Sequence, residues 1–279
     1  MVQNFHIPPS GFGPGSQPAP EDGAELEYLA LPSGMRTYSA HLPDSADTAT
    51  HAPALAVLAD IADHAERVAS GADGVTLDLT GLDAHNRELV AETLGEGEVS
   101  IKMRGVPALA AQESVFAGVW QIKGAGVDVV EIAPVPKAAL TRAFAPVEPA
   151  LGPLAPRTPD VVNAPPLIAE LMDKSAGFVE GALPHVVNLS LLPHTEGDLA
   201  YLDTALGTGS VTILSRGYGN CRVTATGQTH VWRVQFFNSM DTLILDTFEV
   251  TTMPEVAMAA PEDLADSAAR IREVLEAIR

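Results

Sequence analysis

The sequence predicts an α/β protein, of the α+β kind, made of two tandem related units that arose by internal duplication. Three observations predict it: one phrase occurs twice, the same order of strand and helix periodicities surrounds both occurrences, and a proline-rich segment separates them. We expect an irregular Pro/Gly-rich arm at 1–50, a first repeat at 51–142, a Pro-rich linker at 143–166 and a second repeat at 167–279.

The repeated phrase is LGEGEVSIKMRG, beginning at Leu94, and LGTGSVTILSRG, beginning at Leu206. When residues 75–120 are placed on 187–232 without a gap, so that Leu94 falls on Leu206, 12 of the 46 positions are identical. After a six-residue insertion the match resumes, for example between Asp128 and Asp246. Agreement in one register over this length indicates a duplication, and two copies are too few for a solenoid.

The periodicities assign an order of elements to each unit. A helix is expected at 53–69 and at 166–176, and the first carries Leu55, Leu58, Ile61, Ala62 and Ala65 on one face. The alternating segments VTLDL and VNLSL then predict strands at 75–79 and 187–191. A second helix follows in each unit and ends at the repeated Leu-Gly pair, where glycine can adopt the left-handed conformation that closes a helix.

The second halves of the units are expected to be mostly antiparallel strands. VSIKM and VTILS predict one strand each, and two more are expected around Trp120 and Trp232, and around Val129 and Leu245. Thr195 and Asp198 resemble a helix capping box. A final amphipathic helix is expected at 261–278.

Composition and charge exclude several classes of function. The formal net charge is −20, which opposes binding to a phosphate backbone, so no nucleic-acid partner is expected. Cys221 is the single cysteine and cannot form an internal disulfide. No basic region followed by an apolar run opens the sequence and no run of about 18 apolar residues occurs, so we expect a cytoplasmic protein without membrane insertion.

Features present in one copy alone are the best candidates for function, because both copies share the scaffold. The second copy continues as RGYGNCR, and its insertion lies in FNSMDTLILDTFEV, which predicts a longer hairpin beside the same edge. We therefore expect a partner-binding surface there, with Tyr218 and Arg222 as anchors. Its candidate residues are Arg216, Tyr218, Gly219, Asn220, Cys221, Arg222, Asn238, Met240 and Asp241.

Cys221 also raises a different hypothesis. Arg216 and Arg222 could lower its pKa and make the thiol reactive, or it could be a small buried apolar side chain. Together with His185, His194 and His230 it could in principle ligate a metal, although the spacings fit no short metal motif. No catalytic residue and no cofactor are expected.

Two regions resemble the HupH/HyaF family of hydrogenase expression/formation proteins. One runs from LPHVVNLSLLPHTEGD through RGYGNCR and NSMDTLILDT to PEDLADSA, and the other is GFGPGSQP with LEYLALPSGMRTY. The resemblance covers nearly the whole chain. It implies a non-enzymatic accessory protein in the maturation of uptake [NiFe]-hydrogenases. It further implies that the client is the iron–sulfur small-subunit precursor, which bears a twin-arginine signal, and that a thioredoxin-like accessory protein is a companion.

Three hypotheses follow. The first is a client-binding chaperone, favoured by the acidic charge, because a twin-arginine segment is basic. The second is a thiol- or metal-dependent factor in iron–sulfur cluster assembly that uses Cys221. The third is a scaffold that holds other maturation proteins together.

Overall fold

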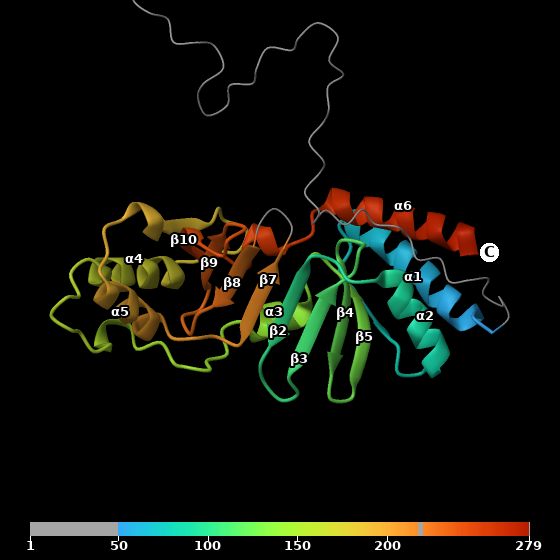
Figure 1. Cartoon of the computed structure of the whole chain (residues 1–279), viewed down its shortest axis with the longest axis horizontal. Helices are drawn as coiled ribbons and strands as arrows, with labels where there is room; N and C mark the ends of the chain where they lie inside the picture. The colour runs from blue at the N-terminus through green and yellow to red at the C-terminus, as the bar shows by residue number, and fades with distance from the viewer. Residues whose placement is uncertain (1–49, 217–219, 279) are drawn as a thin grey trace, which may run out of the picture. The chain divides into compact units, whose positions relative to one another are not determined.

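A computed structural model describes residues 50–216 and 220–278, which belong to one compact unit. The expected arm at 1–50 lies outside this part, except for Thr50. Ten strands form a single sheet in the order β1-β5-β4-β3-β2-β7-β8-β9-β10-β6, and every neighbouring pair is antiparallel (Figure 1). Among the described residues, no helix combines the length and apolarity that a membrane span requires.

The elements follow the same order in both repeats. The first repeat contains α1 (Ala52–Ala69), β1 (Val75–Asp78), α2 (Ala84–Leu94), β2 (Val99–Met103), β3 (Leu109–Glu113), β4 (Val119–Gly124), β5 (Val127–Ile132) and α3 (Lys137–Arg142). The second contains α4 (Ala164–Ala176), β6 (His185–Asn188), α5 (Glu196–Leu206), β7 (Val211–Ser215), β8 (Asn220–Ala225), β9 (Val231–Phe237), β10 (Leu243–Val250) and α6 (Pro261–Ile278). Three short 3-10 helices are η1 (Gly152–Leu154), η2 (Leu189–Leu191) and η3 (Glu255–Ala257).

The strand order confirms the prediction of two related α+β units. Each repeat contributes five strands, and equivalent strands lie at equal distances from the centre of the sheet. The central pair is β2 with β7, in which Ile101 lies directly opposite its own counterpart Ile213. An antiparallel pair has a local two-fold axis between its strands, so the duplication is expressed as an internal pseudo-two-fold arrangement.

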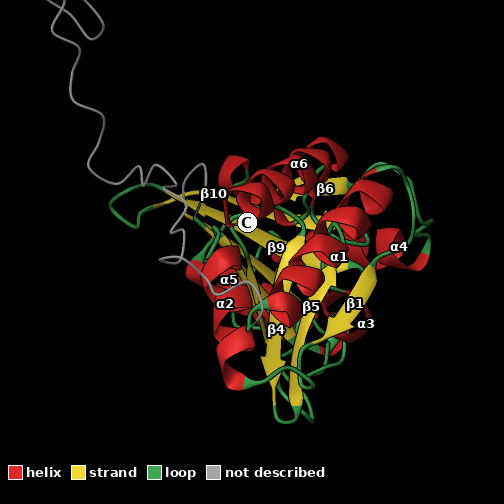
Figure 2. Cartoon of the chain, turned by 90° about the vertical axis from the view of Figure 1, so that its right-hand side faces the viewer, coloured by secondary structure: helices red, strands yellow, loops and turns green. Residues whose placement is uncertain are grey.

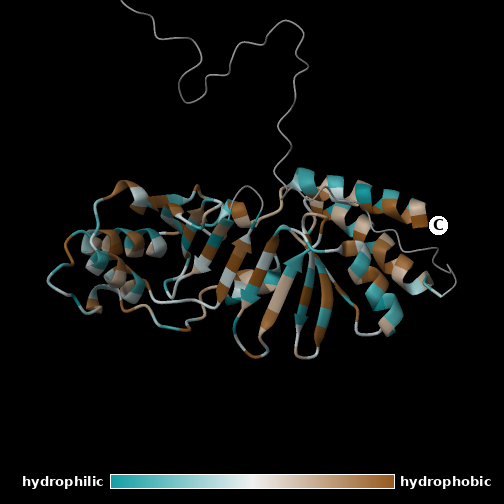
Figure 3. Cartoon of the chain, in the orientation of Figure 1, coloured by the Kyte–Doolittle hydropathy of each residue, from teal (hydrophilic) through white to brown (hydrophobic). Residues whose placement is uncertain are grey.

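The two faces of the sheet are covered differently. One face carries Ile101, Ile213, Trp120 and Trp232, which are fully buried under α3 and the segment around Met253. On the other face, apolar residues gather at the two ends of the sheet, under α1, α2 and α6 at one end and under α4 and α5 at the other. Figure 3 shows the alternation of apolar and polar residues along the strands that this division requires.

The C-terminal helix completes the core of the first repeat. Leu264, Ala268 and Ile271 of α6 pack with α1. Arg272 adds exposed ion pairs to Asp63 and Glu66 on α1. Figures 1 and 2 both place the two helices side by side. The last helix in the sequence therefore lies on the first helix of the fold.

The repeated LGxG phrase forms the corner between a helix and the next strand. Gly95 and Gly207 end α2 and α5 with φ of 58° and 63°, a conformation that L-residues with a Cβ rarely adopt. Gly97 and Gly209 serve another purpose: a Cβ there would collide with backbone oxygens, of Ser114 in one copy and of Ala143 in the other. Both glycines of the phrase are thus scaffold.

Several expected elements agree with the structure and others do not. Both Leu-Gly helix ends, the capping box at Thr195 and the final helix are present. Strands β3 and β8 are not among the expected elements. LAAQE has a weak apolar alternation, whereas NCRVTA alternates polar and apolar residues throughout, and this alternation is the signal that would have found β8. The strand expected at 187–191 was wrong in its bounds: β6 ends at Asn188 and the chain turns into η2.

Pairing with the neighbouring strand explains that error. Val75 lies opposite Ile132 and His185 lies opposite Val250, so Val75 of β1 corresponds to His185 of β6. The gap-free superposition of the two copies had instead placed Val75 on Val187, two positions further along. The same turn then follows in both copies, since Asp78 accepts from the Thr80 amide and Asn188 from the Ser190 amide. Two extra residues after this turn in the second copy restore the register that places Leu94 on Leu206.

The Pro-rich segment at 143–166 lies along the second repeat. Glu148 forms a β-bridge with Thr208, and the Ser210 amide donates to the Ala143 carbonyl oxygen at 2.8 Å. Its end is fixed by Asp198, which is fully buried on α5 and whose Oδ1 accepts from the amides of Val162, Asn163 and Ala164 at 2.8–2.9 Å. One carboxylate therefore caps its own helix and anchors the start of α4.

We expect Asp198→Ala to lower the free energy of unfolding by roughly 2–4 kcal/mol, because it leaves several buried amides without an acceptor. Burial alone would raise the pKa of Asp198, but its hydrogen bonds to Ala164, Thr195, Val162 and Asn163 lower it to about 2. Its stabilisation is therefore complete above pH 3.8 and is lost as the pH falls through about 2. Urea unfolding at pH 7 measures the effect. Asp198→Asn keeps one acceptor oxygen, so its free energy of unfolding should lie between those of wild type and Asp198→Ala. Equal stability of all three proteins would contradict the prediction.

A second stability prediction concerns Glu113 at the end of β3. Burial raises its pKa to about 7, and Glu98 and Asp263 add to the effect, although the Gly118 amide donates to its Oε1 at 3.0 Å. Because the folded-state pKa exceeds the reference value of 4.5, this residue destabilises the fold as pH rises from 4.5 to about 7.

The variant Glu113→Gln cannot lose stability in this way. Its free energy of unfolding, compared with that of wild type, should therefore rise by on the order of 2–3 kcal/mol as the pH rises from 4.5 to 8. The measurement is the difference in unfolding free energy between the two proteins at each pH, in which titrations elsewhere cancel. A difference that does not change with pH would show that Glu113 titrates normally.

Candidate partner-binding site on the second repeat

The two hairpin ends that stand out in the second copy of the sequence lie together. Asn220 begins β8, Asp241 lies in the turn between β9 and β10, and Asn220 Nδ2 donates to Asp241 Oδ1 at 3.2 Å. Because β8 and β9 are neighbours, both turns reach the same end of the sheet. The expectation that the longer hairpin lines the same edge as RGYGNCR therefore agrees with the structure, although Tyr218 and Gly219 lie outside the described residues.

The turn between β9 and β10 is held by Asn238. Its Oδ1 accepts from the amides of Met240 and Thr242 at 2.9 and 3.0 Å, while Asp241 takes a positive φ of 56°. The side-chain oxygen of Asn238 thus takes the place of a backbone carbonyl as the acceptor of hydrogen bonds in the turn. It leaves Met240 on the outside of the turn with 82% of its surface exposed.

The two arginines near this edge are placed differently. Arg216 is exposed, and its amide donates to the Glu98 carbonyl oxygen in the first repeat at 3.1 Å. Arg222 is exposed on β8, with its guanidinium 5.6 Å from the ring centre of Phe237. Arg222 has no ion pair among the described residues, so its charge is free to meet a partner.

The structure places Cys221 in the core. Side chains alternate along β8, so Cys221 points to the opposite face from Arg222 and is buried with Val223, Trp232 and Val234. Burial, with a further contribution from Glu249, raises the pKa of the thiol to about 11. The nearby arginines therefore do not activate it, and the alternative of a small buried side chain is the one observed.

The three histidines do not gather around Cys221. His185 Nε2 lies 2.8 Å from Glu170 Oε1, the His194 ring contacts the Leu192 carbonyl oxygen, and His230 stacks on Phe178 with ring centres 4.0 Å apart. Within the part of the chain that the structure describes, no three His, Cys, Asp or Glu residues are grouped so that they could hold a metal ion.

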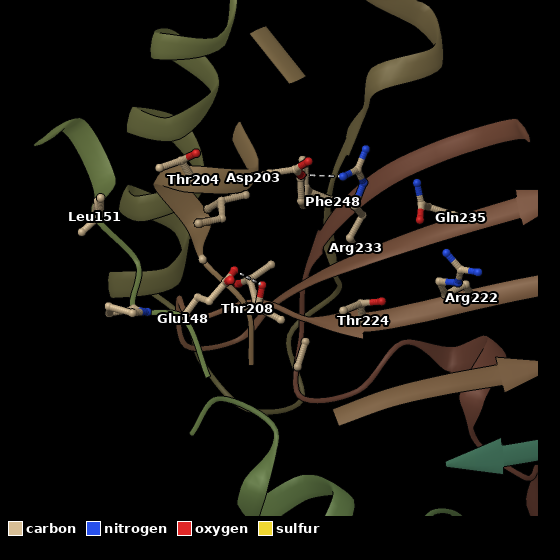
Figure 4. Close-up of a pocket in the computed structure, with 15 residues that line it drawn as sticks. Glu148, Leu151, Asp203, Thr204, Thr208, Arg222, Thr224, Arg233, Gln235 and Phe248 are labelled. Atoms are coloured by element: carbon tan, nitrogen blue, oxygen red, sulfur yellow. Dashed lines mark hydrogen bonds and ion pairs between the residues drawn. The ribbon is translucent and has the colours of Figure 1, made fainter. Parts of the chain in front are cut away.

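A pocket that the sequence did not reveal opens on the polar face of the same strands. It has a volume of about 640 Å³, and Figure 4 shows its labelled lining residues. Strands supply Arg222, Thr224, Arg233, Gln235 and Phe248, α5 supplies Asp203 and Thr204, and the 143–166 segment and the corner after α5 supply Glu148, Leu151 and Thr208.

Arg233 organises this pocket. Its Nε and Nη2 donate to the two oxygens of Asp246 at 2.9 and 2.7 Å, and its Nη1 donates to Asp203 Oδ1 at 2.6 Å. Burial would lower the pKa of Arg233, but its bonds to both carboxylates outweigh burial and raise it. The guanidinium thus ties β9, β10 and α5 together, and its charge is already neutralised.

An equivalent pocket of about 360 Å³ occurs in the first repeat, lined by α2 and by β2, β3 and β4. In the register that places Leu94 on Leu206, Ala91, Ala110 and Gln121 stand where the second repeat has Asp203, Arg222 and Arg233. The charged residues are therefore special to the second copy. Comparing the two copies position by position would have found them in the sequence.

Exposed apolar residues are also concentrated in the second half of the chain. Of the 15 large apolar side chains that are exposed in the described residues, 14 lie between Val147 and Met258, and the other is Val106. Exposed apolar side chains supply the area that a protein partner can bury. The second repeat is therefore the better candidate for contact with another protein.

Comparisons with known proteins point to one family. The family model of the HupH hydrogenase expression protein, C-terminal conserved region, matches residues 52–144 and 161–278. Over their full lengths, the chain is 65% identical to the hydrogenase expression/formation protein HupH of Rhodobacter capsulatus. It is 31% identical to the hydrogenase-1 operon protein HyaF of Escherichia coli, over 98% of this chain and 95% of that protein.

A solved structure, the hydrogenase expression protein HupH from Thiobacillus denitrificans, is 30% identical and covers 41% of this chain and 94% of its own, with a TM-score of 0.37. The family model spans most of the described residues, and the Rhodobacter relative matches from end to end. The chain therefore belongs to the HupH/HyaF family of hydrogenase expression proteins.

Proposed function

We propose that this protein is an accessory chaperone that binds the iron–sulfur small-subunit precursor of an uptake [NiFe]-hydrogenase before twin-arginine export. Relatives of this chain are named hydrogenase expression/formation proteins, which supports a role in hydrogenase maturation. The observation that carries the finer proposal is the asymmetry of the two repeats. A duplicated scaffold exposes its apolar side chains almost entirely on one copy and on the Pro-rich segment along it, as a surface for an incompletely assembled client requires.

Charge favours the same client. The chain has a formal net charge of −20, and a twin-arginine signal is basic, so their encounter is electrostatically favourable and weakens with salt. Binding before export places the protein in the cytoplasm. A thioredoxin-like accessory protein from the same maturation system is a further proposed partner, and a scaffold role for several maturation proteins is the alternative that the binding experiment separates.

The experiment measures the affinity of purified small-subunit precursor, with and without its signal segment, at low salt. A double variant at the hairpin ends, Arg222→Ala with Met240→Ala, should weaken binding about tenfold or more, because arginines and large apolar residues dominate interface energetics. The matched control is Lys123→Ala with Val106→Ala, which removes one exposed cation and one exposed apolar residue from the first repeat.

Loss in the first variant alone supports the proposal and the location. Equal binding by wild type and both variants would support the chaperone function but show that the hairpin ends do not contribute to the interface. No binding of the precursor by wild type, together with binding of another maturation protein, would favour the scaffold.

The thiol-dependent alternative has its own test. Because Cys221 is buried and its pKa is raised to about 11, we expect it to resist Ellman's reagent at pH 8 in the folded protein and to react promptly in denaturant. Cys221→Ala should accordingly leave hydrogenase maturation unchanged in cells. Rapid labelling of the folded protein, joined with loss of maturation in the variant, would restore the thiol mechanism.

A further inference from the structure

Within residues 50–216 and 220–278, the sheet ends at β6, and the outer side of this strand is unpaired. β6 pairs with β10 and is the last strand in the order, so no described strand lies beyond it. No backbone hydrogen bond from the described residues reaches its outer side. Such an edge presents free amide and carbonyl groups to which a further strand can add.

Apolar side chains surround this open edge. Leu183 and Val186 expose 94% and 50% of their surface, and Leu191 and Leu192, which follow the strand closely, expose 80% and 38%. Natural sheets usually protect an edge with polar or charged residues, since an apolar edge invites association. An exposed apolar edge that persists in a folded protein therefore indicates a binding site.

The other end of the sheet provides an internal control. By pairing with β5 and β10, Asp73 and Thr76 of the β1 edge occupy the positions of Leu183 and Val186 of the β6 edge. The first repeat thus has polar residues where the second has apolar ones. Leu192 corresponds to Leu82, because each donates its amide to the carbonyl oxygen three residues before it, of Leu189 and of Leu79. Leu191 then stands where the first repeat has Gly81. The same scaffold folds with a polar edge, so the apolar residues at β6 are not required by the fold.

The charge around β6 identifies the kind of segment that would bind. In the stretch 157–203, which flanks β6 in the sequence, the exposed acidic residues that lack an ion pair to Arg233 outnumber the two exposed cations, Arg157 and Lys174; they are Asp160, Glu170, Asp173, Glu180 and Glu196. Glu170 contacts His185 on β6 itself. This surface disfavours a second acidic copy of the chain and favours a segment that combines apolar with basic residues.

We propose that the β6 edge binds an extended, apolar segment of the hydrogenase small-subunit precursor that carries basic residues, as an eleventh strand of the sheet. The inference rests on the proposed function for the identity of the partner. Backbone pairing supplies affinity for an extended chain, while Leu183, Val186, Leu191 and Leu192 select apolar side chains along it.

The test transfers the first repeat's own edge to the second. Leu183→Asp with Val186→Thr installs the residues found at the equivalent positions beside β1. The control, Val106→Asp, introduces an aspartate at a fully exposed apolar side chain of the first repeat, outside the apolar surface assigned to the client. Binding of purified precursor is measured for all three proteins at low salt, with hydrogen exchange of the β6 amides in the free and bound wild type.

The proposal predicts slower exchange at residues 185–188 on binding and about a tenfold loss of affinity in the edge variant, with the control unchanged. Precursor binding with unaltered β6 exchange and equal affinities would overturn the edge assignment and leave the chaperone function standing. Absence of precursor binding by wild type would overturn both. A wild-type dimer that the edge variant converts to a monomer, measured by light scattering, would assign the edge to a second copy instead.

Discussion

The pairing of β2 with β7 is the interaction on which the rest of the fold depends. It joins two five-stranded half-sheets into one and places Ile101 against Ile213 at the internal two-fold axis. Both side chains are buried in a core shared by the two repeats, which also contains Trp120 and Trp232. Neither half could cover this face alone, because its apolar residues continue across the junction. The duplication therefore yields one cooperative unit instead of two separate domains.

Because the two repeats share one scaffold, the positions at which they differ are the best candidates for function. The second repeat has two extra residues after β6, a longer hairpin between β9 and β10, and a charged pocket where the first has Ala91, Ala110 and Gln121. All three departures lie outside the shared core. They change the surface of the second repeat without changing the strand order.

Sequence periodicity was sufficient for most elements but not for the site. The apolar face of a helix, such as that of Leu58 and Ile61, repeats over several turns, and the Leu-Gly corner requires a backbone conformation that glycine favours. Both features can therefore be predicted from a short stretch of sequence. The burial of Cys221 could not be predicted in the same way, because neighbours in sequence point to opposite faces of a strand and β8 was not among the expected strands. The Arg233 clamp joins three elements that lie apart in the sequence, and no local pattern announces it.

The packing of α6 on α1 has a consequence for how the chain is made. The first helix of the fold emerges from the ribosome early, but the helix that covers it is translated last, after every strand of the sheet. During synthesis the apolar face of α1, including Leu55 and Ala62, has no final cover. The first repeat therefore cannot reach its native state vectorially, domain by domain, as many multidomain chains do. Its native packing must wait until α6, which follows every strand of the sheet, has been synthesised and can meet α1.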